Sequence, residues 1–376
     1  MAGDFIRQLD DSSMSRGKSL LQRLNIDLTM LCLLLLLCVG GLFILYSASG
    51  QNMGMVYRQM VYFGLGFFII FVLAQIDPRW FQMAAPWMYA IGIIALILVL
   101  LVGVGAKGAQ RWLSVFGLFR FQPSEVMKLV TPMMVAWYLS SKLLPPKLNT
   151  IAMVLVLIFL PALLIFKQPD LGTALLVSSA GIFVLLFAGL SSRWIMLAIV
   201  TVLAVAPIMW YGVMHDYQKQ RVLTFLDPES DPLGAGWNII QSKTAIGSGG
   251  VEGKGYLQGT QSQLEFLPER HTDFIIAVYA EEHGLIGVMI LLALYMAIVM
   301  RGIYMASRGR DTFSRLFAGA LVVTFFIYVF VNIGMVSGIL PVVGVPLPLI
   351  SYGGTSIVTL MGAFGVIMSV YMHRRV

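Results

Sequence analysis

Charged residues inside long apolar stretches are the first candidates for chemistry in this sequence. Glu125 and Lys128 lie three residues apart in one such stretch, so a helix would place both on one face. An ionised group at the centre of a membrane-spanning helix costs about 2.5 to 3.5 kcal/mol on insertion scales, so each needs a partner or a function. The two residues therefore form a structural ion pair, which is the favoured interpretation, or bind a ligand that enters where the helix begins.

Two aspartates directly precede apolar stretches. Asp170 stands in the sequence QPDLGT, the pattern of a helix N-cap, and capping is its favoured role. Asp273 opens another stretch after His271-Thr272, where a cap and a catalytic base explain it about equally well. The run Glu281-Glu282-His283, two turns later, indicates a helix break near Gly284 or a polar contact with another helix.

Two common kinds of site are excluded by spacing. The four histidines, at 215, 271, 283 and 373, show no metal-ligand spacing, and the H-E-x-x-H motif is absent from the sequence. The glycine-rich stretch 247–255 lacks the glycine and hydroxyl positions of a Walker phosphate loop. We therefore expect neither a zinc site nor nucleotide binding.

The composition specifies the elements that must position these residues. In 376 residues, 59% are hydrophobic and only 11% are charged, with a mean hydropathy of +0.86. Apolar stretches of about 20 residues match helices that cross a bilayer. The almost unbroken aliphatic runs Leu31 to Leu45 and Ile93 to Val104 exclude the alternating strands of a membrane β-barrel. The net charge of +7 is spread without a dense basic cluster, so no nucleic-acid partner is expected.

The sequence predicts an all-α polytopic membrane protein with about ten transmembrane helices. The expected spans are 27–46, 56–75, 82–104, 124–141, 149–166, 171–190, 194–213, 273–303, 316–337 and 355–371. Basic residues gather in the first 26 residues and in alternate connections, which predicts that both termini are cytoplasmic. Residues 1–26 would then be a cytoplasmic tail and 27–376 a single membrane domain.

Two connections stand out. Residues 215–272, between the seventh and eighth spans, would lie outside the cytoplasm, and nearly sixty residues with several large apolar side chains predict an ordered, functional loop. Residues 338–356 contain Pro341, Pro346 and Pro348 and no charge. Such a segment is either packed into the protein beside the last span or an ordinary outer loop.

Five motifs follow in order along the chain. They are RWL at 111–113, FQPSE at 121–125 followed by Lys128, QPDLGT at 168–173, LPERHTDF at 267–274 and GVPLPLISYGG at 344–354. Together they resemble the SEDS proteins (shape, elongation, division and sporulation), over essentially the whole chain after the polar leader. The stretch GTQSQ at 259–263 is similar to the elongation branch of the family rather than to the division branch. His283 departs from the pattern, which has an aliphatic residue there.

This resemblance implies a function and its partners. SEDS proteins polymerise lipid II into peptidoglycan glycan strands at the outer face of the bacterial cytoplasmic (inner) membrane. The implied partners are lipid II, the growing lipid-linked strand, a class B penicillin-binding protein that crosslinks the product, other membrane proteins of the elongation complex, and membrane lipid. The catalytic residue implied by the family falls on Asp273.

The chemistry of this reaction fits one carboxylate. Asp273 would take the proton of the acceptor 4-hydroxyl, and the departing lipid diphosphate needs positive charge rather than a proton. The candidate substrate-binding residues, for diphosphate or sugar, are Arg111, Glu125, Lys128, Asp170, Arg221 and Lys243. A divalent cation, Mg²⁺ or Mn²⁺, carried by the diphosphate is the one cofactor left open.

Three alternatives remain at this stage. Ten spans with internal charges would also suit a lipid II flippase, although the paired broken helices typical of transporters are not seen in the sequence. A scaffold without catalytic activity would recruit the penicillin-binding protein only. Within the family, a division polymerase is the alternative to an elongation polymerase.

Overall fold

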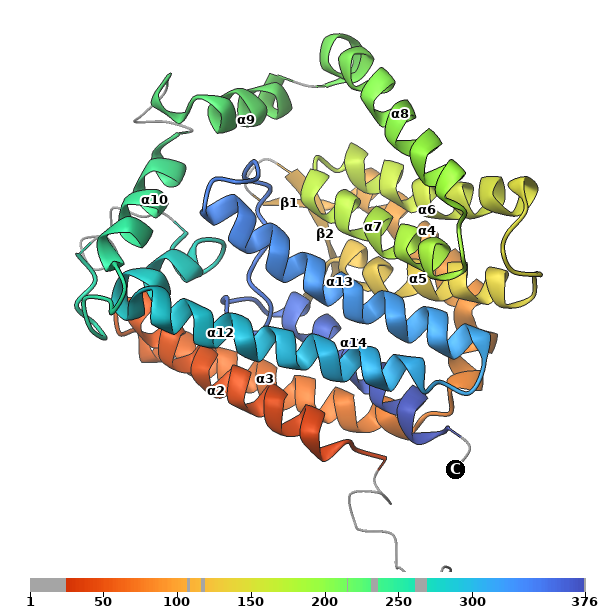
Figure 1. The fold of residues 1–376 in the computed structure, drawn as a ribbon, viewed down its shortest axis with the longest axis horizontal. Helices are drawn as coiled ribbons and strands as arrows, with labels where there is room; N and C mark the ends of the chain where they lie inside the picture. Colours follow the sequence, from red (N-terminus) through yellow and green to blue (C-terminus); the bar gives the residue numbers. More distant parts are fainter. Residues whose placement is uncertain are drawn as a thin grey trace, which may run out of the picture.

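The computed structural model describes residues 25–106, 109–115, 119–214, 216–230, 236–260 and 269–374. Most of the predicted tail 1–26 lies outside these ranges, as do residues 215, 231–235 and 261–268 of the predicted loop. Helices dominate the described residues, which confirms the predicted fold class (Figure 1).

Each of the ten predicted spans coincides with a helix. These helices are α2 (Leu28–Ala48), α3 (Met53–Gln75), α4 (Pro78–Val102), α5 (Pro123–Ser140), α6 (Leu148–Lys167), α7 (Leu171–Phe187), α8 (Ser192–Ile208), α12 (Ile275–Ser307), α13 (Thr312–Val336) and α14 (Thr355–Met372). By length and composition, eight described helices are able to cross a membrane, with α8 extended to Gly212 by the π-helix η2 (Met209–Val213). The short helix α7 and the charged helix α5 are not among the eight, so the count of ten spans stays a prediction.

A small sheet between α4 and α5 was not predicted. Strands β1 (Val104–Ala106), β2 (Ala109–Val115) and β3 (Phe119–Phe121) pair antiparallel in the order β1-β2-β3. The strands are too short to show a clear alternation in the sequence, and the predicted third span ran two residues past the end of α4, to the first residue of β1. The sheet carries Arg111 on its central strand.

The charged and polar helices lie inside the bundle. Helix α5 packs against α4, α6, α7 and α13, while α14 packs along α3 and α12 packs against α2 and α13. Because α5 is buried in the bundle, its two charged side chains face protein rather than lipid, which lowers the cost of charge within a membrane domain. In contrast, none of the residues of α8 is buried, and Figure 1 shows this helix extending away from the rest of the bundle.

The described part of the loop 215–272 contains α9 (Asp216–Leu226), the 3₁₀ turn η3 (Pro228–Ser230) and α10 (Trp237–Gly249). Helix α10 lies against α12. The chain after α10 donates backbone hydrogen bonds to α12, from Lys254 N to Glu281 O (3.0 Å) and from Gly255 N to Glu282 O (2.9 Å). These donors satisfy carbonyls that are freed where α12 breaks, and the predicted break at Gly284 is confirmed by its φ of 63° and ψ of −164°.

Two glycines permit this close pairing. A Cβ atom added at Gly253 would lie 2.2 Å from Glu282 O, and one added at Gly284 would lie 2.4 Å from Gly253 N. Both residues also have positive φ, a conformation that glycine adopts at little cost. The loop and the broken helix are therefore joined backbone to backbone.

Candidate active site

Asp273 lies at the start of α12 and is partly buried. The helix begins at Ile275 with Phe274 as its N-cap, so Asp273 stands one residue before the capping position. The backbone carbonyl of Asp273 accepts a hydrogen bond of 2.8 Å from Nδ2 of Asn332 on α13. The N-cap position of α12, which the sequence left open for Asp273, is therefore occupied by Phe274.

The segment 338–354, between α13 and α14, faces the Asp273 carboxylate. A Cβ atom added at Gly344 would lie 3.4 Å from Oδ2 of Asp273, and Gly344 has a φ of +74°. Asn332 Nδ2 donates a second hydrogen bond, of 2.7 Å, to the Val345 carbonyl. One buried amide therefore fixes both the backbone of Asp273 and the part of the segment that faces it.

Further hydrogen bonds tie the segment to the residues just before Asp273. Ser351 Oγ donates to the Thr272 carbonyl (2.5 Å), and Tyr352 N donates to the His271 carbonyl (2.9 Å). From α3, Gln59 Nε2 donates to the Ser351 carbonyl (3.1 Å). Val345, Leu347, Leu349, Ile350 and Ser351 are buried. Of the two interpretations of this segment, the structure supports the packed one, in which protein groups satisfy an irregular backbone.

Asp170 has two roles in the structure. Its Oδ1 accepts a hydrogen bond of 3.2 Å from Thr173 N, which confirms the predicted N-cap of α7. Its Oδ2 accepts a hydrogen bond of 3.3 Å from Gln122 Nε2 and lies 3.8 Å from Nε of Arg111. Arg111 Nη2 also donates a hydrogen bond to the Pro169 carbonyl, at 2.6 Å. The motifs at 111–113, 121–125 and 168–173 thus meet at one place.

The Asp170 cluster and Asp273 flank the same stretch of chain. A Cβ atom added at Gly172, two residues after Asp170, would lie 2.7 Å from the Val343 carbonyl. Gly344, the next residue, faces Asp273. The start of α7 and the start of α12 therefore both lie against residues 343–345.

Glu125 and Lys128 form the predicted ion pair on α5. The distance from Lys128 Nζ to Glu125 Oε1 is 2.5 Å, and the residues are 7% and 5% exposed. Lys128 Nζ also lies 4.8 Å from the ring centroid of Tyr328 on α13. Glu125 lines a cavity of about 700 Å³ between α3, β2, α5 and α14, together with Tyr62, Leu65, Trp112, Phe121, Val126, Gly354, Thr355, Val358 and Thr359. Glu125 thus pairs with Lys128 and also borders this cavity.

The remaining two candidates lie on the loop. Lys243 of α10 is exposed, and a Cβ atom added at Gly338 would lie 2.1 Å from its Cε, which places the lysine beside the first residue of the segment 338–354. Arg221 lies on α9, which Figure 1 draws at a distance from α12 and α13. The side chain of Arg221 is not among those that the structure describes. Lys243 therefore lies beside the segment that faces Asp273.

Asn332 and Gln59 are site residues that the sequence interpretation missed. Both are fully buried, at 0% exposure, and both hold backbone around Asp273. The available signal was an amide side chain within an apolar span, since polar groups at membrane depth need a structural or functional reason.

A divalent cation was left open, and the described residues do not form a cage for one. Within the ranges that the structure describes, no three side chains of the His, Cys, Asp and Glu types are grouped so as to hold a metal ion. Magnesium typically binds through one or two carboxylates plus substrate phosphates.

Comparisons with known proteins agree with the motifs. The family model described as cell cycle protein, for FtsW, RodA and SpoVE, matches residues 27–376. Peptidoglycan glycosyltransferase MrdB of Escherichia coli K12 is 56% identical over 358 residues, which cover 95% of this chain and 96% of the relative.

Two solved structures have a similar fold. One, described as structural coordination of polymerization and crosslinking by a peptidoglycan synthase complex, has a TM-score of 0.81 at 31% identity and covers 92% of this chain and 97% of the other. The other, Thermus thermophilus Rod shape determining protein RodA, has a TM-score of 0.69 at 28% identity, with coverages of 93% and 97%. The chain therefore belongs to the FtsW, RodA and SpoVE family of cell cycle proteins, the SEDS family that its motifs resemble.

Proposed function

We propose that this peptidoglycan glycosyltransferase polymerises lipid II during cell elongation with Asp273 as the general base. The main support for this proposal is the position of the Asp273 carboxylate against Gly344, together with the hydrogen bond from Asn332 that holds the backbone of Asp273. The elongation role is supported by the 56% identity to MrdB and by the structural likeness to a rod shape determining protein. Together these features favour an enzyme over a flippase or a scaffold.

The proposed reaction needs one base and one group of cations. The acceptor 4-hydroxyl oxygen forms a bond to C1 of the donor sugar, and its proton passes to the Asp273 carboxylate. The bond from C1 to the lipid diphosphate breaks, and the electron pair leaves with the diphosphate. Attack opposite the leaving group inverts the configuration at C1.

Arg111 is the best-placed cation for the leaving diphosphate. Its Nε is buried without a hydrogen-bond partner, although Asp170 Oδ2 lies 3.8 Å away. A diphosphate oxygen would satisfy this donor and gain a charge-assisted hydrogen bond. Lys243 supplies a second positive charge along the segment 338–354, whereas Lys128 already pairs with Glu125. Glu125 and Asp170 act mainly by holding Lys128 and Arg111, and a divalent cation would arrive with the substrate diphosphate.

We also propose the surroundings in which the enzyme works. The distribution of basic residues supports cytoplasmic termini and a loop 215–272 outside the inner membrane of a bacterium. A class B penicillin-binding protein is the proposed partner, since the similar synthase complex couples polymerisation to crosslinking. Lipid II and the growing lipid-linked strand enter from the membrane, alongside other proteins of the elongation complex.

The direct test is to incubate the purified protein with lipid II in the presence and absence of the penicillin-binding protein, and then to separate polymer from monomer. Polymer formation that is lost in Asp273→Asn supports the proposal. Transbilayer movement of lipid II in vesicles without any polymer would support a flippase instead. If only the partner's crosslinking activity responds to this chain, the chain is a scaffold.

A further inference from the structure

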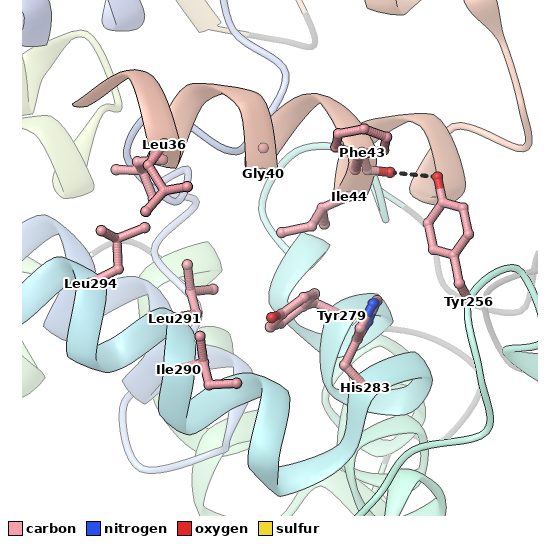
Figure 2. A pocket seen from close by; sticks show the side chains of 12 residues that line it. Leu36, Gly40, Phe43, Ile44, Tyr256, Tyr279, His283, Ile290, Leu291 and Leu294 are labelled. Carbon is pink, nitrogen blue, oxygen red and sulfur yellow. Dashed lines mark hydrogen bonds between the residues drawn. The ribbon is translucent and has the colours of Figure 1, made fainter. Parts of the chain in front are cut away.

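Cationic side chains are unevenly distributed along α2 and α12, which also form an apolar groove outside the candidate active site. The groove has a volume of about 530 Å³, and Figure 2 shows Leu36 and Phe43 of α2 and Leu291 of α12 among its walls. Tyr279 and His283 lie toward one end, and no arginine or lysine of the described residues lines the groove. An anionic ligand would therefore find no cationic partner there.

Cations gather instead at the end of α12, where the helix approaches Ser307. Arg301 Nε and Nη2 donate to the two carboxylate oxygens of Asp27, at 3.1 and 2.5 Å. Asp27 is buried, and its Oδ1 also accepts a hydrogen bond of 2.8 Å from Met30 N, as the N-cap of α2. This bidentate pair joins the start of α2 to α12, so a structural role accounts for Arg301.

Arg301 is the centre of a larger cluster that alternates arginine and tyrosine. Its Cζ lies 5.1 Å from the ring centroid of Tyr304 on α12 and 5.6 Å from that of Tyr371 on α14. Arg308 Cζ lies 5.4 Å from the Tyr304 centroid, and Arg374 Cζ lies 3.5 Å from the Tyr371 centroid. The two ring centroids are 6.0 Å apart. Cation-π contacts thus hold three guanidinium groups around two rings, and we name these five residues the arginine-tyrosine cluster.

The positive charge of the arginine-tyrosine cluster is only partly balanced. Among the residues that the structure describes, Asp27 is the one carboxylate that pairs with an arginine of the cluster. Arg308 and Arg374 make no ion pair within this part of the chain, and Nη1 of Arg374 is buried without a hydrogen-bond partner. A buried donor is costly to leave unsatisfied. An anion with several acceptor oxygens would satisfy this donor and offset the remaining charge.

The exposed face of α12 beside the cluster has the profile of a phospholipid site. Four of its residues recur at intervals of four positions: Met296, Met300, Tyr304 and Arg308. Such spacing places them on one side of the helix. The first three are 45%, 62% and 42% exposed, and Arg308 is exposed as well. Apolar side chains are therefore followed by an aromatic ring and then by a cation, which matches the acyl chains, the interfacial region and the phosphate of a lipid.

We propose that the arginine-tyrosine cluster binds the head group of an anionic phospholipid in the leaflet that faces the cytoplasm. Arg308 and Arg374 supply donors and charge for the phosphate, while Arg301 stays paired with Asp27. The acyl chains lie along the apolar part of the exposed face of α12. In the proposed orientation this end of α12 is cytoplasmic, and basic pockets between helices on that side bind anionic head groups. This inference goes beyond the proposed function, since no step of polymerisation depends on it.

A lipid fits these observations better than a soluble anion or an acidic protein segment. A soluble phosphate would not explain why the cluster continues into an exposed apolar face. An acidic segment of a cytoplasmic protein would contact the polar ends of the helices. Met300 and Met296 lie roughly 12 and 18 Å before Arg308 along α12, at a depth that hydrocarbon chains occupy.

The experiment measures lipid binding by the purified full-length protein in detergent. Phosphatidylglycerol is the anionic probe, phosphatidylethanolamine the zwitterionic probe and inorganic phosphate the soluble probe, all at equal ionic strength because salt screens charge. Native mass spectrometry counts bound lipid, and the melting temperature reports binding to the folded state. We expect the wild type to retain phosphatidylglycerol in preference to phosphatidylethanolamine. Phosphatidylglycerol should also raise the melting temperature, whereas inorganic phosphate should not.

Two variants locate the site. The double variant Arg308→Gln with Arg374→Gln keeps the pair of Arg301 and Asp27. We expect it to bind phosphatidylglycerol about tenfold more weakly or worse, as the loss of charge-assisted hydrogen bonds implies. Tyr304→Leu removes a ring that contacts two of the arginines and leaves every charge in place. It should also weaken binding of phosphatidylglycerol.

The matched control is a second double variant, Arg79→Gln with Arg193→Gln. It removes the same charge from two exposed arginines on the same side of the membrane in the proposed orientation. Within the described residues, neither side chain lies over an aromatic ring or pairs with a carboxylate. Binding of phosphatidylglycerol by this control should match that of the wild type.

Four results would overturn the inference. Equal weakening in the two double variants would show that general surface charge attracts the lipid. Equal retention of both lipids by the wild type would show that the site does not select an anionic head group. Retention of neither lipid would leave an acidic protein segment as the ligand to seek. Stabilisation by inorganic phosphate that the cluster variant abolishes would assign the cluster to a soluble anion.

The melting temperature without lipid shows whether each variant is folded. A cluster variant that melts near the wild-type temperature but loses phosphatidylglycerol supports the inference. If this double variant fails to fold, Tyr304→Leu decides, because it changes no charge: unaltered binding of phosphatidylglycerol by Tyr304→Leu would then overturn the assignment to the cluster.

Discussion

Asn332 holds the backbone of Asp273 in place through a hydrogen bond of 2.8 Å from its side-chain amide to the Asp273 carbonyl. The same nitrogen donates to Val345, in the segment that the Asp273 carboxylate faces. A base that must meet a sugar hydroxyl needs its position fixed before the substrate arrives, because misplacement by about 1 Å lowers a rate by about a hundredfold. Asn332 is therefore a positioning residue.

Replacing Asn332 should affect rate more than substrate binding. Asn332→Leu removes two donors from buried carbonyls, at a cost of about 1 to 3 kcal/mol for each unsatisfied group. We expect a lower melting temperature and a kcat reduced at least tenfold, with a smaller change in KM. The control is Thr324→Val on the same helix, which removes only the bond to the Ala320 carbonyl and should leave kcat near the wild-type value. Equal losses of kcat in the two variants would contradict a role for Asn332 in positioning Asp273.

Asp273→Asn tests the base itself. Asparagine keeps the size of the side chain, but its amide does not accept the proton of the acceptor hydroxyl at neutral pH. The expected loss of polymer formation is on the order of a hundredfold or more, with unchanged expression, melting temperature and partner binding. Near wild-type polymerisation of lipid II by this variant would rule out Asp273 as the base and would direct the search to Glu125 or Asp170.

The ion pair of Glu125 and Lys128 should behave as a unit. Removing one partner leaves a buried charge uncompensated, which costs about 3 to 5 kcal/mol. Glu125→Gln and Lys128→Met should each lower the melting temperature strongly, and the double variant should be more stable than the sum of the two effects predicts. Additive effects in thermal unfolding of the purified proteins would show that the two side chains are not coupled.

Accessibility of single cysteines tests the proposed orientation. In a background without Cys32 and Cys38, Ser230→Cys on the loop should react with a membrane-impermeant reagent in intact cells with a permeabilised outer membrane. Ser141→Cys, after α5, should react only once the inner membrane is lysed. Both serines are exposed, so differences in labelling reflect the side of the membrane. The opposite pattern would invert the topology.

Local patterns in the sequence predicted local structure well. Apolar runs located the helices, the spacing of three residues predicted the ion pair of Glu125 and Lys128, and the QPDLGT motif predicted the cap at Asp170. The contact between Asn332 and Asp273 was not predictable in this way, because the two residues are 59 positions apart. No periodicity encodes such a contact, and only the packing of α13 against α12 creates it. The same holds for Arg111, whose approach to Asp170 depends on a sheet of short strands.

The close approach of the backbone at Gly253 to the backbone at Gly284 restricts how this chain can diverge in evolution. A side chain at either glycine would collide with the main chain of the other segment, which no change of rotamer relieves. Substitutions on the exposed faces of the loop should therefore be tolerated, whereas the two glycines must be kept together. A chimaera that exchanges the loop without the broken helix would separate the two, so homologous recombination within this family should preserve residues 249–286 as one block.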